Sequence, residues 1–203
     1  MQAYDVEHYI LKQTEGLSDL RIRQLCRSLF VRLYRDREQD CLFRYSAMTA
    51  LCMQALKHDA AIRVGMLTGM LGPGIPNAWC ELDGAVYDFG VYAGVPDIPS
   101  LAPWAPGRDL PVINEKYEDI WYANYEPGVL PQRWRMFEAL SGMTLRDYFD
   151  RMPGTWGQKS WKQMLEALRL DCGLGIQEAG LKSLAATVAF PKAGDVKIDK
   201  ERL

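Results

Sequence analysis

The dipeptide Asp83-Gly84 separates two short runs of alternating apolar and polar residues, 77–82 and 85–90. Asp-Gly is favoured in two-residue hairpin turns because both central residues of such turns take positive φ angles. A two-residue loop pairs Leu82 with Ala85 and fixes the register of the two strands. The sequence therefore predicts an antiparallel hairpin over 77–90.

The register of this hairpin decides which side chains share a face, since successive side chains of a strand point to opposite faces. One face receives the apolar residues Ala78, Cys80, Leu82, Ala85, Tyr87 and Phe89. The other face receives Asn77, Trp79, Glu81, Val86 and Asp88. On this second face Asn77 and Asp88 are diagonal neighbours, about 7–8 Å apart at the backbone.

Two helices and a strand are predicted before the hairpin. Ser18 and Asp19 are suitable N-caps for a helix with apolar residues at three- and four-residue spacing. Its expected buried face consists of Ile22, Leu25, Cys26, Leu29, Phe30 and Leu33. A second helix is expected to begin with Asp40 as N-cap and to continue through Leu56, and 61–67 is typical of a short strand.

The chain after the hairpin gives weaker signals. The segment 96–131 is rich in proline and aromatic residues and poor in periodicity, which is typical of a long packed loop. Helices are expected over 133–140, 144–151 and 160–170. Thr144 and Ser160 are the expected N-caps of the last two.

The composition is that of an ordinary globular domain. The chain has 203 residues, 48% of them hydrophobic and 25% charged, so we expect one domain over 1–203. The formal net charge of -2 gives no reason to expect nucleic acid as a partner. The N-terminus has no basic start followed by an apolar run, and no apolar stretch is long enough to span a bilayer. We expect a cytoplasmic protein without a membrane partner.

Five cysteines are scattered along the chain: Cys26, Cys41, Cys52, Cys80 and Cys172. Their odd number and the lack of any Cys-x-x-Cys pair speak against a disulfide framework and against a zinc site. No metal and no cofactor are expected. Four of the cysteines are expected to be structural, whereas Cys41 lies in the first turn of a helix if Asp40 is its cap. There, free N–H groups and the helix dipole favour the thiolate.

The order of these features resembles the transglutaminase-like (papain-related) superfamily. In that superfamily a cysteine that opens a helix is followed by a short strand, a His-Ala-Trp strand and an aspartate on the next strand. The matching segments are Asp40-Cys41-Leu42-Phe43-Arg44, Ala61-Ile62-Arg63-Val64-Gly65, Asn77-Ala78-Trp79-Cys80-Glu81 and Tyr87-Asp88-Phe89. The run Cys-Leu-x-Arg is also similar to the leader-processing cysteine proteases of lasso-peptide biosynthesis.

The resemblance implies an α+β fold in which a cysteine-bearing helix packs on an antiparallel sheet. The motif core spans 40–90, about a quarter of the chain, and a helical extension is expected over about 131–190. The implied catalytic residues are Cys41, Asn77 and Asp88. Asn77 stands where the superfamily has its histidine, and asparagine cannot take up a proton at physiological pH.

Two further residues are candidates for binding substrate. Gln39 could donate to an oxyanion, as an upstream glutamine does in papain-like enzymes, or be a solvated loop residue. Trp79 could contact a substrate or pack across the hairpin, and Asp88 could equally be a structural carboxylate at a strand end.

Another histidine could replace the missing base. His58 lies near the far end of the helix that starts at Cys41, roughly 25 Å away if that helix is continuous, and is then excluded. His8 stays open, because an N-terminal segment folded over the site could bring it close.

Two functions follow. The first is cysteine-dependent amide acyl transfer or hydrolysis through a thioester on Cys41, of the protease, deamidase or transglutaminase type. The alternative is a catalytically inactive transglutaminase-like protein that binds a peptide or protein partner. Both imply a peptide or protein as substrate or partner.

Overall fold

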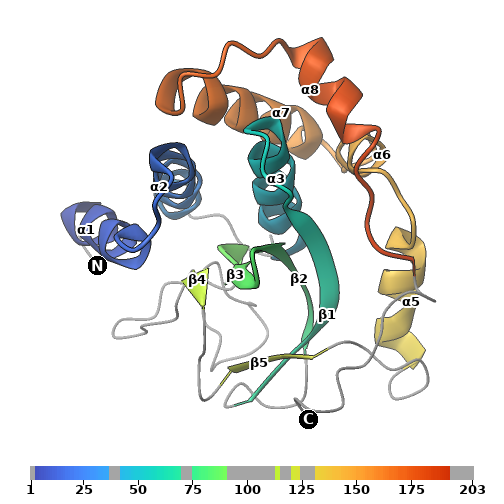
Figure 1. Cartoon of the computed structure of the whole chain (residues 1–203). Helices are drawn as coiled ribbons and strands as arrows, with labels where there is room; N and C mark the ends of the chain where they lie inside the picture. Colours follow the sequence, from blue (N-terminus) through green and yellow to red (C-terminus); the bar gives the residue numbers. More distant parts are fainter. Residues whose placement is uncertain are drawn as a thin grey trace.

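The computed structural model describes residues 3–36, 42–69, 75–90, 113–114, 120–123 and 131–192. This part of the chain is a mixed α and β protein with an antiparallel sheet in the order β4-β3-β2-β1-β5 (Figure 1). The strands are β1 (Ala61–Gly69), β2 (Ile75–Leu82), β3 (Ala85–Tyr87), β4 (Ile113–Asn114) and β5 (Ile120–Ala123). The first three helices are α1 (Ala3–Thr14), α2 (Leu20–Arg35) and α3 (Leu42–Ala55). They are followed by α5 (Pro131–Leu140), α6 (Leu145–Asp150), α7 (Trp156–Glu166), the π-helix η2 (Ala167–Asp171) and α8 (Glu178–Ala185).

The predicted hairpin is confirmed as β2 and β3. Leu82 pairs with Ala85 and Cys80 with Tyr87, which is the register of a two-residue loop. Asp83 and Gly84 have φ angles of 53° and 78°, both positive as an Asp-Gly turn requires. Strand pairing ends at Tyr87, so the second strand is shorter than the predicted run 85–90.

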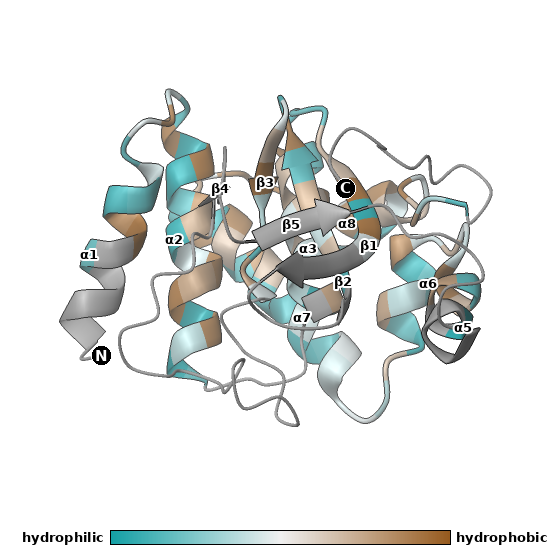
Figure 2. Ribbon diagram, turned by 90° about the horizontal axis from the view of Figure 1, so that it is seen from below, coloured by the Kyte–Doolittle hydropathy of each residue, from teal (hydrophilic) through white to brown (hydrophobic). Residues whose placement is uncertain are grey.

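Helix α2 forms as the sequence predicts. The Asp19 carboxylate accepts the backbone N–H groups of Arg21 at 2.7 Å and of Ile22 at 3.4 Å, so Asp19 is the N-cap. All six residues of the expected apolar face are buried. In Figure 2 α2 carries hydrophobic and hydrophilic residues side by side along its length, as expected for a helix with one buried face.

Helix α3 packs on β2, and two contacts show how it lies. Ser46 Oγ donates to the backbone oxygen of Ala78 at 2.5 Å, and two turns later the sulfur of Met53 lies 3.6 Å from Cys80 Sγ. Residue numbers along α3 and β2 thus increase together. The core is built between this helix, the sheet and α2, where the rings of Phe30 and Phe89 meet at 6.2 Å.

The C-terminal helices confirm one predicted cap and correct the other. Thr144 Oγ1 accepts the backbone N–H of Asp147 and caps α6. Helix α7 begins at Trp156, so the prediction that Ser160 caps it is wrong. Ser160 lies inside α7, where its hydroxyl donates to the carbonyl of Trp156 four residues earlier at 2.8 Å. Because a serine hydroxyl can form this hydrogen bond inside a helix, a serine alone does not mark the start of a helix.

The prediction that 96–131 is a loop is wrong at two places. Ile113–Asn114 forms β4 beside β3, and Ile120–Ala123 forms β5 beside β1. Most of the remainder of 96–131, and most of the tail after Pro191, lie outside the described residues. None of the helices in the described ranges has the length and apolar character needed to cross a membrane.

Candidate functional site

Asn77 and Asp88 are in direct contact. Asn77 lies on β2, Asp88 directly follows β3, and both residues have no exposed surface. The amide nitrogen Nδ2 of Asn77 donates to Oδ2 of Asp88 at 2.6 Å. The hairpin register therefore does bring these two side chains to the same face, as the alternation of residues predicts.

The orientation of the Asn77 amide follows from this contact. In this arrangement the NH₂ group of Asn77 donates to Asp88, whose carboxylate oxygens are acceptors, and the oxygen Oδ1 points elsewhere. Oδ1 is buried, and no hydrogen-bond partner for it is found in the described part of the chain. Since buried polar atoms are nearly always paired, this oxygen marks a place where a donor belongs. An amide oxygen accepts a hydrogen bond there but does not take up the proton.

The first described turn of α3 lies at the Asn77 end of β2. Ser46 is one turn after Leu42, and it bonds the backbone of Ala78, the neighbour of Asn77. At 1.5 Å rise per residue, the four residues from Leu42 to Ser46 cover about 6 Å of helix axis. The helix thus begins close to the Asn77–Asp88 pair. Cys41, its expected cap Asp40 and the candidate Gln39 lie outside the described residues.

Trp79 is packed rather than open. Its side chain is 4% exposed, and in the sheet it lies opposite Arg63 of β1. This burial favours the interpretation in which Trp79 packs within the fold. Only the 4% of the Trp79 surface that stays exposed is available for contact with a substrate.

Both histidines of the chain are described, and each lies away from the start of α3. His58 follows the opposite end of the unbroken helix α3, where its Nε2 is 3.1 Å from Oδ2 of Asp19. Burial alone would raise the pKa of Asp19, but the N–H donors of Arg21 and Ile22 and the His58 charge outweigh it and lower that pKa. His58 thus has a structural partner at the N-cap of α2.

His8 is exposed on α1. Helix α1 packs on α2, and α2 lies between α1 and α3 in both views (Figures 1 and 2). In this arrangement His8 does not fold over the start of α3.

The other four cysteines are unreactive by environment. Cys26, Cys52 and Cys80 have no exposed surface and Cys172 is 7% exposed. Burial raises the pKa of each thiol, and for Cys172, where the Asp171 charge adds to burial, the pKa rises to about 11. None of these four cysteines is therefore a candidate for thiol chemistry near neutral pH, and Cys41 lies outside the described residues.

Arg44 in the first turn of α3 is a site neighbour whose role the sequence did not reveal. It is 4% exposed, its guanidinium carbon lies 4.8 Å from the Trp156 ring centre, and Nη1 is 3.4 Å from both Ser160 Oγ and Gln163 Oε1. Burial lowers the pKa of this guanidinium, although the group stays charged. The contacts tie the beginning of α3 to α7, a long-range pairing with no local signal.

In the described ranges no three acidic, histidine or cysteine side chains gather closely enough to hold a metal ion. Comparison with protein-family models, with curated proteins and with solved structures gives no match.

Proposed function

We propose that this chain is a transglutaminase-like protein that binds a peptide or protein partner at the Cys41, Asn77 and Asp88 site without catalysing acyl transfer. The observation that carries the proposal is the orientation of Asn77, which gives its donor to Asp88 and leaves a buried acceptor, Oδ1, unpaired. Because this atom is fully buried, a donor from within the fold, such as the Cys41 thiol, can bond it and keep its proton, so the thiol would face a hydrogen-bond acceptor and no base.

The missing base is the second support. A cysteine nucleophile is activated by an oriented group that takes its proton, or by a strongly lowered pKa. Asn77 does not take a proton, His58 is paired with Asp19, and His8 is exposed on α1. The contact of residue 77 with an aspartate is what a triad would use to orient a histidine, and the group that would transfer the proton is missing.

Cysteine-dependent acyl transfer or hydrolysis is the second candidate, and the retained Asn77–Asp88 contact favours it. In that reaction the Cys41 sulfur attacks an amide carbon, the amine leaves with a proton, and water or a second amine cleaves the thioester. Asp88 would orient Asn77, and Asn77 would orient the attacking group. Without a base the reaction is expected to be slow.

Restoring the base tests whether Cys41 lies beside residue 77, which both candidates require. The measurement is the rate of iodoacetamide alkylation at Cys41, read by peptide mass spectrometry at pH 7. Asn77→His is expected to raise this rate about tenfold, because a thiol pKa lowered by one unit gives about ten times more thiolate. Asn77→Gln, which also lacks a base, is the matched control and is expected to leave the rate unchanged.

Activity provides the opposing outcome. Wild-type protein is expected to release no new amino termini and no ammonia from glutamine-containing peptides, and Cys41→Ala should behave identically. Turnover by the wild type that disappears in Cys41→Ala would overturn the non-catalytic proposal in favour of the second candidate. No change of alkylation rate in Asn77→His would instead show that Cys41 is not beside residue 77.

A further inference from the structure

Helix α2 concentrates positive charge in a chain whose formal net charge is -2. Between Leu20 and Arg35 it has no acidic residue and five arginines: Arg21, Arg23, Arg27, Arg32 and Arg35. At 100° per residue, Arg27, Arg32 and Arg35 fall on one side of the helix. This side faces η2, the π-helix that packs against α2.

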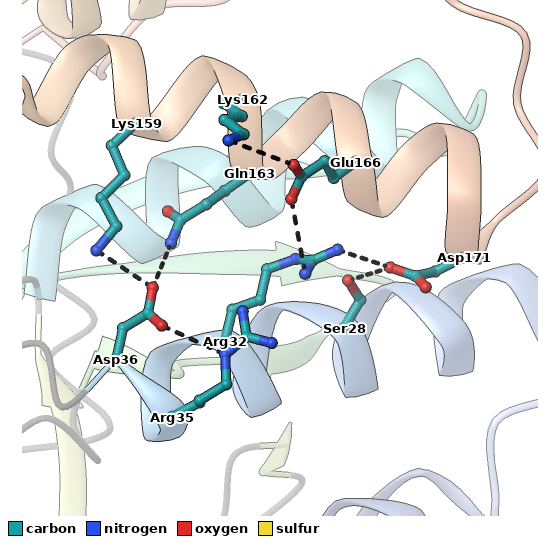
Figure 3. Close-up of polar contacts among 9 residues, drawn as sticks. All are labelled: Ser28, Arg32, Arg35, Asp36, Lys159, Lys162, Gln163, Glu166 and Asp171. Atoms are coloured by element: carbon teal, nitrogen blue, oxygen red, sulfur yellow. Dashed lines mark hydrogen bonds and ion pairs between the residues drawn. The ribbon is translucent and has the colours of Figure 1, made fainter.

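A cleft of about 420 Å³ lies between this side of α2 and the end of η2. Its polar wall is held in place by three side chains shown in Figure 3. Asp171 Oδ2 lies 3.1 Å from Arg32 Nη2 and accepts the Ser28 hydroxyl at 2.6 Å. Arg32 is also 3.8 Å from the Glu166 carboxylate. Arg32 is therefore neutralised and fixed by acidic groups of the fold.

The two remaining arginines of the cleft are exposed. Arg27 is an exposed lining residue, and Arg35, whose side chain is 67% exposed, contacts its sequence neighbour Asp36 at 3.4 Å. They are eight residues apart, which is about 12 Å along the helix. Two anionic groups on one extended segment can span that distance.

Between these charges the cleft has an apolar part. Val31 of α2 and Leu170 of η2 line it, and Leu170 is 77% exposed, more than any other large hydrophobic residue of the described chain. Leu170 is held outward by the π-helix, in which the Cys172 N–H reaches back five residues to the Ala167 carbonyl. An exposed leucine beside two cations fits a ligand that is both apolar and acidic.

We propose that this cleft binds an acidic segment of a protein partner, with carboxylates on Arg27 and Arg35 and an apolar side chain between Val31 and Leu170. Charge complementarity selects this partner. A nucleic acid fits less well, because its regularly spaced phosphates bring no aliphatic side chain to the part of the cleft lined by Val31 and Leu170. Asn77 and Asp88 do not line the cleft, so the interaction is separate from the function proposed above.

The test uses a fluorescein-labelled peptide of glutamates flanking one leucine, with binding followed by fluorescence anisotropy at physiological salt. The double variant R27Q/R35Q is expected to weaken binding about tenfold, since it removes two exposed charge pairs. The matched control R146Q/R151Q removes the same charge from the distant helix α6 and its end, and should change binding less than about twofold. Leu170→Ser is expected to weaken binding about fivefold through lost apolar contact.

Because every substituted side chain is exposed, the variants should keep the wild-type melting temperature. Three results would overturn the proposal: no binding by the wild type, an equal loss in R27Q/R35Q and R146Q/R151Q, or no effect of Leu170→Ser. Tighter binding of a single-stranded oligonucleotide than of the peptide, lost in R27Q/R35Q, would assign the cleft to nucleic acid instead.

Discussion

The Asn77–Asp88 contact predicts a large, pH-dependent cost for Asn77→Asp. The substitution keeps the size of the side chain and replaces the NH₂ donor, 2.6 Å from Asp88 Oδ2, with a second carboxylate oxygen. Both residues have no exposed surface. Two ionised carboxylates this close would repel each other by several kcal/mol even at an effective dielectric of about 20, so the pair is expected to keep one shared proton.

The magnitude follows from that proton. In the unfolded chain aspartate loses its proton at an ordinary pKa of about 3.9, so holding one in the folded state costs about 1.4 kcal/mol for each pH unit above it. The cost is about 4 kcal/mol at pH 7 and about 1.5 kcal/mol at pH 5. The folded variant binds one proton more than the unfolded chain. Its stability therefore decreases as the pH rises.

Urea unfolding at pH 5 and pH 7 measures this difference. The exposed substitution Gln158→Glu adds the same charge and should change the free energy of unfolding by less than about 0.5 kcal/mol at either pH. An equal cost of Asn77→Asp at the two pH values would contradict this prediction, because the folded variant would then hold no more protons than the unfolded chain.

Two further predictions concern the packing of the helices. Gly157→Ala is expected to lower the free energy of unfolding by about 3 kcal/mol or more in urea titrations, because a Cβ there would lie 2.0 Å from the backbone oxygen of Phe149. In the control Gly175→Ala the added Cβ meets nothing within 4 Å, so this variant is expected to cost less than about 0.5 kcal/mol. Equal costs would contradict the close approach of α6 and α7. Burial would raise the pKa of Asp36, but Lys159, 3.2 Å away, and Arg35 outweigh it and lower that pKa. A carboxylate with a lowered pKa adds stability at pH values above its ordinary pKa, and this stability is lost as the pH falls through the pKa of the folded state. Asp36→Asn should therefore cost at most about 0.5 kcal/mol at pH 7 for this partly exposed pair, and nothing at pH 2. An equal cost at the two pH values would contradict this prediction.

The parts of the fold that the sequence predicts correctly are those specified by local chemistry. The turn at Asp83-Gly84 needs positive φ, the N-cap Asp19 satisfies N–H groups two and three residues later, and the apolar spacing of α2 identifies its buried face. The contact between Asn77 and Asp88 follows from the same local register. Each of these features is determined within about a dozen residues.

What the sequence did not predict depends on distant partners. Strand β5 forms because Ile120–Ala123 pairs with β1, more than fifty residues earlier in the chain, and its own residues have no clear alternation. Arg44 is buried by Trp156, Ser160 and Gln163 of α7, which no spacing rule near Arg44 indicates. The role of the amide oxygen of Asn77 also required the observed orientation of the side chain.

The proposal that Cys41 has no base beside it is tested most directly by the pH dependence of alkylation at Cys41 in the wild-type protein. The other four cysteines are buried with raised pKa values, so labelling of folded protein reports Cys41. We expect the alkylation rate to have its midpoint within about one pH unit of the ordinary thiol pKa of about 8.5, with slow labelling at lower pH. A fast reaction with a midpoint below about 6.5, as for a thiolate paired with a base, would contradict it.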